Sequence, residues 1–161
     1  MGVIICVVGA ILTIALFILF KLSDNKHYDV FSFKEAIDLA DMPIITFYNN
    51  NRKFNFLLDT GSAISAINKS VLCNIEHSLL SNSISYVGIN GIDGYGNTCN
   101  IKVKYKDNEF EDEFAIIDLD DAFNSIKNST GVQIHGILGT KFFEKYKYVL
   151  DFSNFTVYRK K

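Results

Sequence analysis

The chain carries the segment Phe56-Leu57-Leu58-Asp59-Thr60-Gly61-Ser62-Ala63, in which an apolar stretch leads directly into an aspartate and a glycine turn. A carboxylate at the end of an apolar strand is costly to bury unless hydrogen bonds or a shared proton compensate for the lost water. Asp59 is therefore a candidate for chemistry. The alternative is an aspartate that only accepts backbone N–H bonds in a turn, which is a common role for Asp beside glycine. The local sequence leaves both interpretations open.

Short strands are expected on both sides of this segment. Ile44–Tyr48 and Lys53–Leu58 are rich in β-branched and aromatic residues, and the polar turn Asn49–Arg52 between them predicts a hairpin. The same pattern predicts strands at Ser83–Ile89, Thr98–Tyr105, Phe110–Ile117, Tyr148–Phe152 and Phe155–Tyr158, and helices only at Asp118–Lys127 and Thr140–Tyr146 in this half of the chain. The fold class is therefore predicted to be mainly β.

Three motifs in order along the chain resemble the retropepsin-like aspartic protease family. Leu57–Ala63 matches the family signature of a hydrophobic pair followed by Asp-Thr-Gly-Ser. Ile137-Leu138-Gly139 stands where the family has two hydrophobic residues and a glycine before a short helix and a terminal strand. The glycine-rich stretch Tyr86–Gly96 stands where the family has a mobile hairpin, the flap. The resemblance covers about Pro43 to Tyr158.

The resemblance implies a closed, barrel-like β domain with a flap hairpin and one short C-terminal helix. It implies that Asp59 is catalytic and that the rest of its loop supports it, with Thr60 bonding across two halves of the site and Ser62 bracing the Asp59 carboxylate. The implied supporting residues are Thr60, Gly61, Ser62 and Ala63 in the loop, Gly88, Ile89, Asn90, Gly91 and Ile92 in the flap, and Ile137, Leu138 and Gly139 packed under the loop.

The family chemistry implies that a peptide or protein substrate is hydrolysed by water activated between two carboxylates that share a proton. This sequence has one Asp-Thr-Gly, and neither Asp93 nor Asp151 enters the same kind of turn. The second carboxylate is therefore expected from a second copy in a two-fold homodimer. The rival interpretation keeps the fold without catalysis, as a membrane-tethered module that binds peptides or dimerises.

Composition argues against other classes of partner. The 161 residues carry 16 Lys and Arg against 18 Asp and Glu, so no overall positive field favours nucleic acid. Cys73, Cys99, His77 and His135 lack the paired spacing of a zinc site, so we expect no metal and no cofactor. Whether Cys73 and Cys99 form a disulfide stays open.

The N-terminus predicts a membrane anchor. Residues 3–20 contain no charged side chain, and eighteen residues in a helix span about 27 Å, near the lower limit for a bilayer. A cleaved signal peptide fits less well, because no Lys or Arg precedes the apolar run. Lys21 and Lys26 after the run favour a cytoplasmic position for the domain. The expected organisation is an anchor at 3–20, a polar tether at 21–41 and a protease domain at 42–161.

Overall fold

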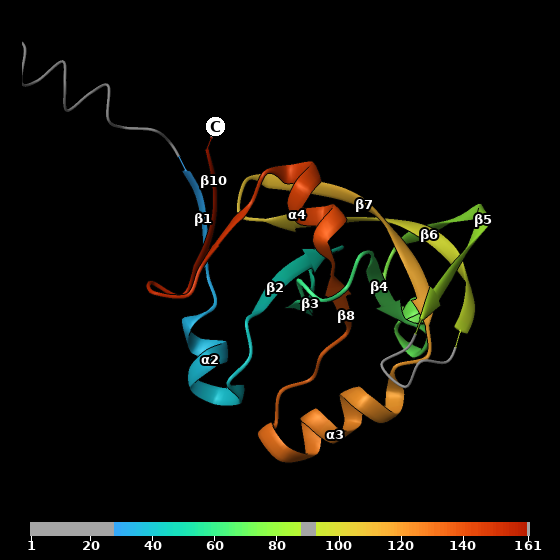
Figure 1. Cartoon of the computed structure of the whole chain (residues 1–161), viewed down its shortest axis with the longest axis horizontal. Coiled ribbons are helices and arrows are strands. Elements are labelled where there is room, and N and C mark those ends of the chain that lie inside the picture. The colour runs from blue at the N-terminus through green and yellow to red at the C-terminus, as the bar shows by residue number, and fades with distance from the viewer. Residues whose placement is uncertain (1–27, 88–92, 161) are drawn as a thin grey trace, which may run out of the picture.

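The computed structural model describes residues 28–87 and 93–160, and it is built mainly of strands (Figure 1). The strands are β1 (Tyr28–Ser32), β2 (Ile44–Asn49), β3 (Arg52–Leu58), β4 (Ser65–Asn68), β5 (His77–Val87), β6 (Asp93–Tyr105), β7 (Asn108–Ile117), β8 (Gly136–Leu138), β9 (Val149–Asp151) and β10 (Thr156–Lys160). The helices are α2 (Lys34–Ala40), α3 (Asp120–Thr130) and α4 (Thr140–Tyr146), with a 3-10 turn η1 (Lys69–Asn74).

Six of the strands close into a ring. The sheet order is β2-β3-β8-β4-β7-β6-β5, and an additional pairing of β2 with β6 at Tyr48 and Lys104 closes the first six on themselves. The β2–β3 hairpin turns through Asn50 and Asn51, which both have positive φ (46° and 62°), as the tightest hairpin turns require. The prediction of a mainly β, barrel-like domain is therefore confirmed.

Two pairings within the ring are parallel and join distant segments. β3 pairs with β8, with Leu57 beside Ile137 and Leu58 beside Leu138. β4 pairs with β7 in the same sense from Ser65 to Asn68. These pairings bring the end of β3, the start of β4 and the end of β8 to one place.

The interior of the ring is filled largely by phenylalanine. Phe56 and Phe114 are completely buried, and their rings lie 5.8 Å apart. Phe47 lies 5.9 Å from Phe56 and 5.7 Å from Phe110 in edge-to-face geometry, which aromatic pairs prefer. A smaller cluster of Ala40, Ile44, Phe123 and Ile134 joins helices α2 and α3 to the rim of the sheet.

A second, three-stranded sheet corrects the predicted tether. Its order is β1-β10-β9, so the first described strand pairs antiparallel with the last one (Figure 1). Phe31 and Phe33 are each 1% exposed and belong to the main core. Residues 28–41 are therefore part of the folded domain. Their mostly polar sequence suggested a linker, but it includes two large aromatic side chains that are buried in the core.

The remaining predictions of elements mostly hold. The hairpin at 44–58 and the helices near 118–127 and 140–146 are confirmed, and β5 and β6 are longer than expected. The short strands β1, β4 and β8 were not expected. The predicted anchor at 3–20 lies outside the described residues. Within residues 28–87 and 93–160, none of the helices is long and apolar enough to cross a membrane.

Candidate active site

Asp59 stands at the end of β3, where the chain leaves the ring. Its N–H donates to the carbonyl oxygen of Leu138 (3.0 Å), which continues the parallel pairing of β3 with β8 by one residue. The preceding Leu58 is buried, whereas Asp59 is partly exposed. The apolar strand thus delivers the carboxylate to the surface with its backbone fixed.

The turn after Asp59 is tied to the carboxylate itself. The Gly61 N–H donates to Asp59 Oδ1 (2.8 Å), and the Ser62 N–H donates to the Asp59 carbonyl oxygen (3.3 Å). A Cβ on Gly61 would stand 3.1 Å from the same Oδ1, so glycine lets the backbone approach the carboxylate closely. Thr60 and Gly61 are exposed, which leaves this turn accessible to another molecule.

Ser62 does not brace the Asp59 carboxylate in this chain. Its hydroxyl donates to the carbonyl oxygen of Ile64 (2.7 Å), and a hydroxyl has a single hydrogen to donate. The Gly61 amide supplies the bond to the carboxylate instead. This corrects the role that the family resemblance implied for Ser62.

Helix α4 holds the second half of the loop. The N–H of Thr140 donates to Ser62 O (2.8 Å), and the N–H of Lys141 donates to Ala63 O (3.3 Å). The Thr140 hydroxyl reaches the same two carbonyl oxygens at 3.1 and 3.2 Å. The first N–H groups of a helix have no partner within the helix, so these loop carbonyls satisfy them.

Leu138 and Gly139 lie directly beside this loop, and Ile137 pairs with Ala66 on β4. Leu138 is 1% exposed, and a Cβ on Gly139 would stand 2.4 Å from the backbone of Ile64. Real Cβ atoms do not approach backbone so closely, so only glycine lets β8 turn into α4 here.

The predicted flap tip, Gly88, Ile89, Asn90, Gly91 and Ile92, lies outside the described residues. The two arms that lead to it are paired antiparallel up to Val87 and Asp93. Gly94 lies opposite Tyr86, and a Cβ there would stand 2.4 Å from the tyrosine ring, so the ring covers the glycine. The arms therefore form a hairpin with an aromatic brace just before the tip.

Asp151 is already bonded within its own turn. Asp151 accepts the N–H groups of Ser153 (2.9 Å) and Asn154 (3.1 Å) and the Asn154 side-chain amide (2.8 Å). These bonds, the side-chain amide first, lower the pKa of Asp151. They make it a cap of the β9–β10 turn.

Cys73 and Cys99 do not pair with each other. Cys73 is exposed, Cys99 is buried, and both thiols are free. Burial, with the nearby Glu113 charge, raises the pKa of Cys99 to about 11, so it stays a neutral thiol at physiological pH. In the part of the chain that the structure describes, no group of three or more His, Cys, Asp or Glu side chains is arranged to hold a metal ion.

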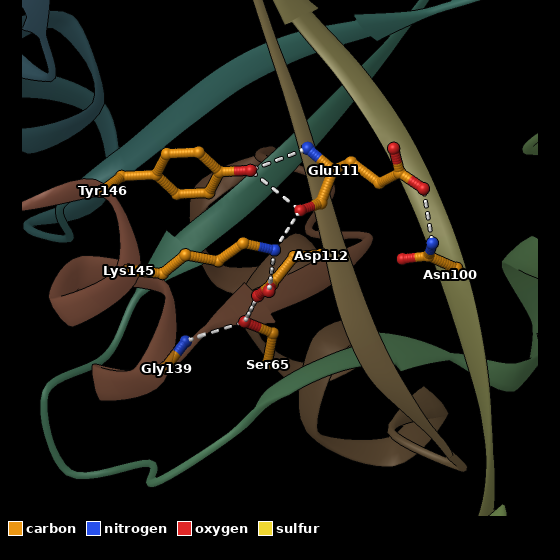
Figure 2. A network of polar contacts seen from close by, with 7 residues as sticks. All are labelled: Ser65, Asn100, Glu111, Asp112, Gly139, Lys145 and Tyr146. Atoms are coloured by element: carbon orange, nitrogen blue, oxygen red, sulfur yellow. Dashed lines mark hydrogen bonds and ion pairs between the residues drawn. The ribbon is translucent and has the colours of Figure 1, made fainter.

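A cluster beside the loop was not expected from the sequence. Ser65, Asp112 and Lys145 meet next to Gly139 (Figure 2). They line part of a cavity of about 420 Å³ together with Ile64, Asn82, Ile84, Thr98, Glu113, Ala115 and Lys141. One signal was present in the sequence: in β7 the alternation of Phe110 and Phe114 places Asp112 on the inward face, where a carboxylate needs partners.

Comparisons with known proteins found similarity among solved structures and none among family models or curated proteins. No protein-family model matches the sequence, and a search of curated proteins finds no significant match. Among solved structures, the foamy viral protease-reverse transcriptase in complex with RNA/DNA hybrid aligns with a TM-score of 0.44 and 13% sequence identity. The alignment covers 65% of this chain and 12% of the viral chain, so this chain corresponds to a small part of that protein.

Proposed function

We propose that this chain is an aspartic endopeptidase of the retropepsin kind, active as a homodimer to which each copy contributes Asp59. One observation carries the proposal: in an intact Asp-Thr-Gly turn, Leu138 fixes the Asp59 backbone and the Gly61 N–H holds the Asp59 carboxylate, which stays partly exposed.

The proposed reaction needs a second carboxylate opposite Asp59. One carboxylate of the pair takes a proton from water, and the water oxygen forms a bond to the peptide carbonyl carbon. The protonated carboxyl gives its proton to the carbonyl oxygen. The C–N bond then breaks as the leaving nitrogen takes a proton from one carboxyl, and one hydroxyl of the diol returns its proton to the other carboxylate, which restores the single shared proton. Two close carboxylates share one proton readily, because both cannot be ionised cheaply at such short range.

The second copy is the proposed source of the missing group. A two-fold axis brings the same residue to itself, so a single Asp59 per chain becomes two per site. We propose that residues 88–92 close over the bound peptide as a flap and that residues 3–20 anchor the chain in a membrane. The basic residues Lys21 and Lys26 favour the cytoplasmic side for the domain. Confinement to one surface would raise the rate at which two copies meet.

The first test is the substitution Asp59→Asn in the full chain. The amide keeps the shape of the side chain but cannot take the proton from water, so cleavage of a peptide library should fall to the background. Asp107→Asn is the matched control, since Asp107 is an exposed carboxylate in the β6–β7 turn. It should keep full activity, and a pepstatin-type inhibitor should stop both the wild type and this control. Turnover by a pure Asp59→Asn preparation would rule out the mechanism.

A mixing experiment tests the shared site. Wild-type and Asp59→Asn chains are unfolded and refolded together at fixed wild-type concentration and rising mutant fraction. At equal amounts and random pairing, about one quarter of the dimers keep two carboxylates, so activity falls faster than dilution predicts. Activity that ignores added mutant, although mixed dimers form, would mean that one chain holds a complete site. A folded dimer that binds peptides without cleaving them would favour the non-catalytic module.

A further inference from the structure

The peptide group between Leu138 and Gly139 is held from both sides. Its carbonyl oxygen accepts the N–H of Asp59 (3.0 Å), and its N–H donates to the hydroxyl oxygen of Ser65 (3.3 Å). Leu138 and Gly139 are both buried, and an unpaired polar group in such a place is costly. The orientation of this one peptide group therefore bears directly on the backbone position of Asp59.

The acceptor role of Ser65 depends on Asp112. Ser65 is 1% exposed, and its hydroxyl donates to Asp112 Oδ2 (3.1 Å). A hydroxyl carries one hydrogen and two lone pairs. With the hydrogen committed to Asp112, the lone pairs are turned toward the Gly139 N–H, as the chain of dashed lines in Figure 2 shows.

Asp112 is in turn held by helix α4. Lys145 lies 3.3 Å from Asp112 Oδ1 and also donates to the carbonyl oxygen of Glu111. The Tyr146 hydroxyl donates to the same carbonyl (2.7 Å) and accepts the Glu111 N–H (2.8 Å). The Asp112 side chain is 12% exposed and the Lys145 side chain is 50% exposed, so water competes little for the bond from Ser65 and more for the ion pair with Lys145. Both carboxylate oxygens are therefore occupied, each by a different element of the fold.

We propose that Ser65 and Asp112 are positioning residues that orient the Leu138–Gly139 peptide group and thereby fix the backbone of Asp59. Neither residue touches substrate or supplies a proton. Loss of the Ser65 hydroxyl leaves the Gly139 N–H without its acceptor and loosens the bond from Asp59 to Leu138. In Asp112→Asn one of the two oxygen positions becomes an NH2 group, which donates and cannot accept, so either Ser65 or Lys145 loses the acceptor that it faces. The effect on catalysis rests on the proposed function, whereas the effect on the Asp59 backbone does not.

The test follows amide hydrogen exchange residue by residue in the full chain. In Ser65→Ala the Asp59 and Gly139 amides should exchange about tenfold faster, while the amides of Ile101 and Val103 in β6 keep their rates. Ser65→Thr restores a hydroxyl and should return the Asp59 rate toward the wild type. Ser70→Ala is the matched control, because the Ser70 hydroxyl donates to Asp120 (2.7 Å) at the other end of β4. It should leave both amides unchanged.

Activity measurements complete the test and separate it from the proposed function. In an active protein, Ser65→Ala and Asp112→Asn should lower kcat with little change in KM, and Ser70→Ala should change neither. If Ser65→Ala fails to fold, Asp112→Asn carries both measurements. Unchanged exchange of the Asp59 amide in a folded variant overturns the proposal. An inactive wild type in which the exchange still responds to Ser65 overturns the proposed function and upholds the positioning role.

Discussion

The ring of strands and the terminal sheet differ in what they contribute to the molecule. The ring strands lie between residues 44 and 138, and the described residues of the candidate site lie on these strands, on the loop that follows β3 and on helix α4. The terminal sheet carries none of them and joins the two ends of the described chain. Phe31 from this sheet nevertheless packs against Phe47, Tyr105, Phe110 and Tyr148, so the ring lacks a complete core without it.

This difference shows that the site and its stability come from separate parts of the sequence. The residues that precede the first hairpin look like a linker because they are polar and mixed in composition. They nevertheless provide one edge strand and two of the most deeply buried side chains. Changes in the terminal sheet should therefore act on folding without altering any residue of the site.

The largest effect is expected from where the chain is shortened. Removal of residues 1–22 leaves β1 intact, whereas removal of residues 1–40 deletes Phe31 and Phe33. Loss of a buried phenylalanine side chain costs about 3–5 kcal/mol, and two such losses approach the whole stability of a typical domain. The shorter deletion should stay folded and the longer one should unfold. Circular dichroism with thermal melting measures both.

Two further outcomes would change the comparison. A cooperative transition at the same temperature in both truncated proteins would show that the terminal sheet contributes nothing to the core. The shorter deletion also tests the anchor: it should be soluble without detergent, and continued association with membranes would contradict an anchor at residues 3–20.

A single substitution also tests whether the terminal sheet contributes to the core. Phe31→Ala should reduce the free energy of unfolding by about 3–5 kcal/mol, because the ring that it removes is 1% exposed and surrounded by aromatic side chains. Val30→Ala is the matched control in the same strand, since Val30 points to the other face and is 44% exposed. It should cost less than about 1 kcal/mol. Equal losses in denaturant titrations of the two variants would contradict the placement of β1.

The sequence predicted the features that depend on residues near each other in the chain, and it did not predict those that depend on distant segments. The β2–β3 hairpin and helix α4 were predictable, because alternation, turn residues and helical spacing are local. The placement of Asp59 at the end of a strand was predictable for the same reason. Strands β4 and β8 have four and three residues, too short for a periodic pattern, and they pair with each other and with β7 and β3, which are distant in the sequence.

The residues around Asp59 were harder to predict than Asp59 itself. Ser65 and Asp112 are 47 positions apart, and only the parallel pairing of β4 with β7 brings them together. The partner of Ser62 depends on the local path of the chain after Gly61, which the family signature does not specify. The inward position of Asp112 between two phenylalanines was a usable signal. It indicated a buried carboxylate without indicating its partners.

A smaller loss of stability is expected from a substitution at Gly139, where β8 turns into α4 beside the loop that follows Asp59. Gly139→Ala places a Cβ within 2.4 Å of the Ile64 backbone, and the strain should cost about 3 kcal/mol. Gly131→Ala is the control: its φ of 78° disfavours alanine, but no atom lies within 4 Å of the added carbon, so about 1 kcal/mol is expected. Chemical denaturation ranks the two. A larger loss of stability in Gly131→Ala than in Gly139→Ala would show that a side chain can be accommodated at Gly139 beside Ile64.

The smallest effect is a dependence of stability on pH that arises in the ring. His135 Nδ1 accepts the N–H of Asn55 on β3 (2.9 Å), so a proton at that nitrogen ends the bond. Burial lowers the pKa of His135, and the charge of Lys127 lowers it further. An unfolded histidine has a pKa of about 6.5, so as the pH falls below that value the unfolded chain takes up the proton before the folded one does.

His135 should therefore leave the stability unaffected above about pH 7. Stability should decline as the pH falls below about 6.5 and stop declining once the His135 imidazole of the folded protein is also protonated. In His135→Asn the side-chain oxygen can still accept from Asn55 but cannot titrate, so the decline should be smaller in this variant.

The carboxylates of Asp120 and Asp151 act in a lower pH range. Hydrogen bonds, chiefly from Ser70 to Asp120 and from Asn154 to Asp151, hold the pKa values of these carboxylates below the usual one. Residues 28–33 and 149–160 of the terminal sheet contain no histidine, so the ring is the part that should respond between about pH 6.5 and 5. Denaturant titrations at pH 7.5, 6 and 5 measure the slope, and an equal slope in the wild type and His135→Asn would assign the acid sensitivity to another group.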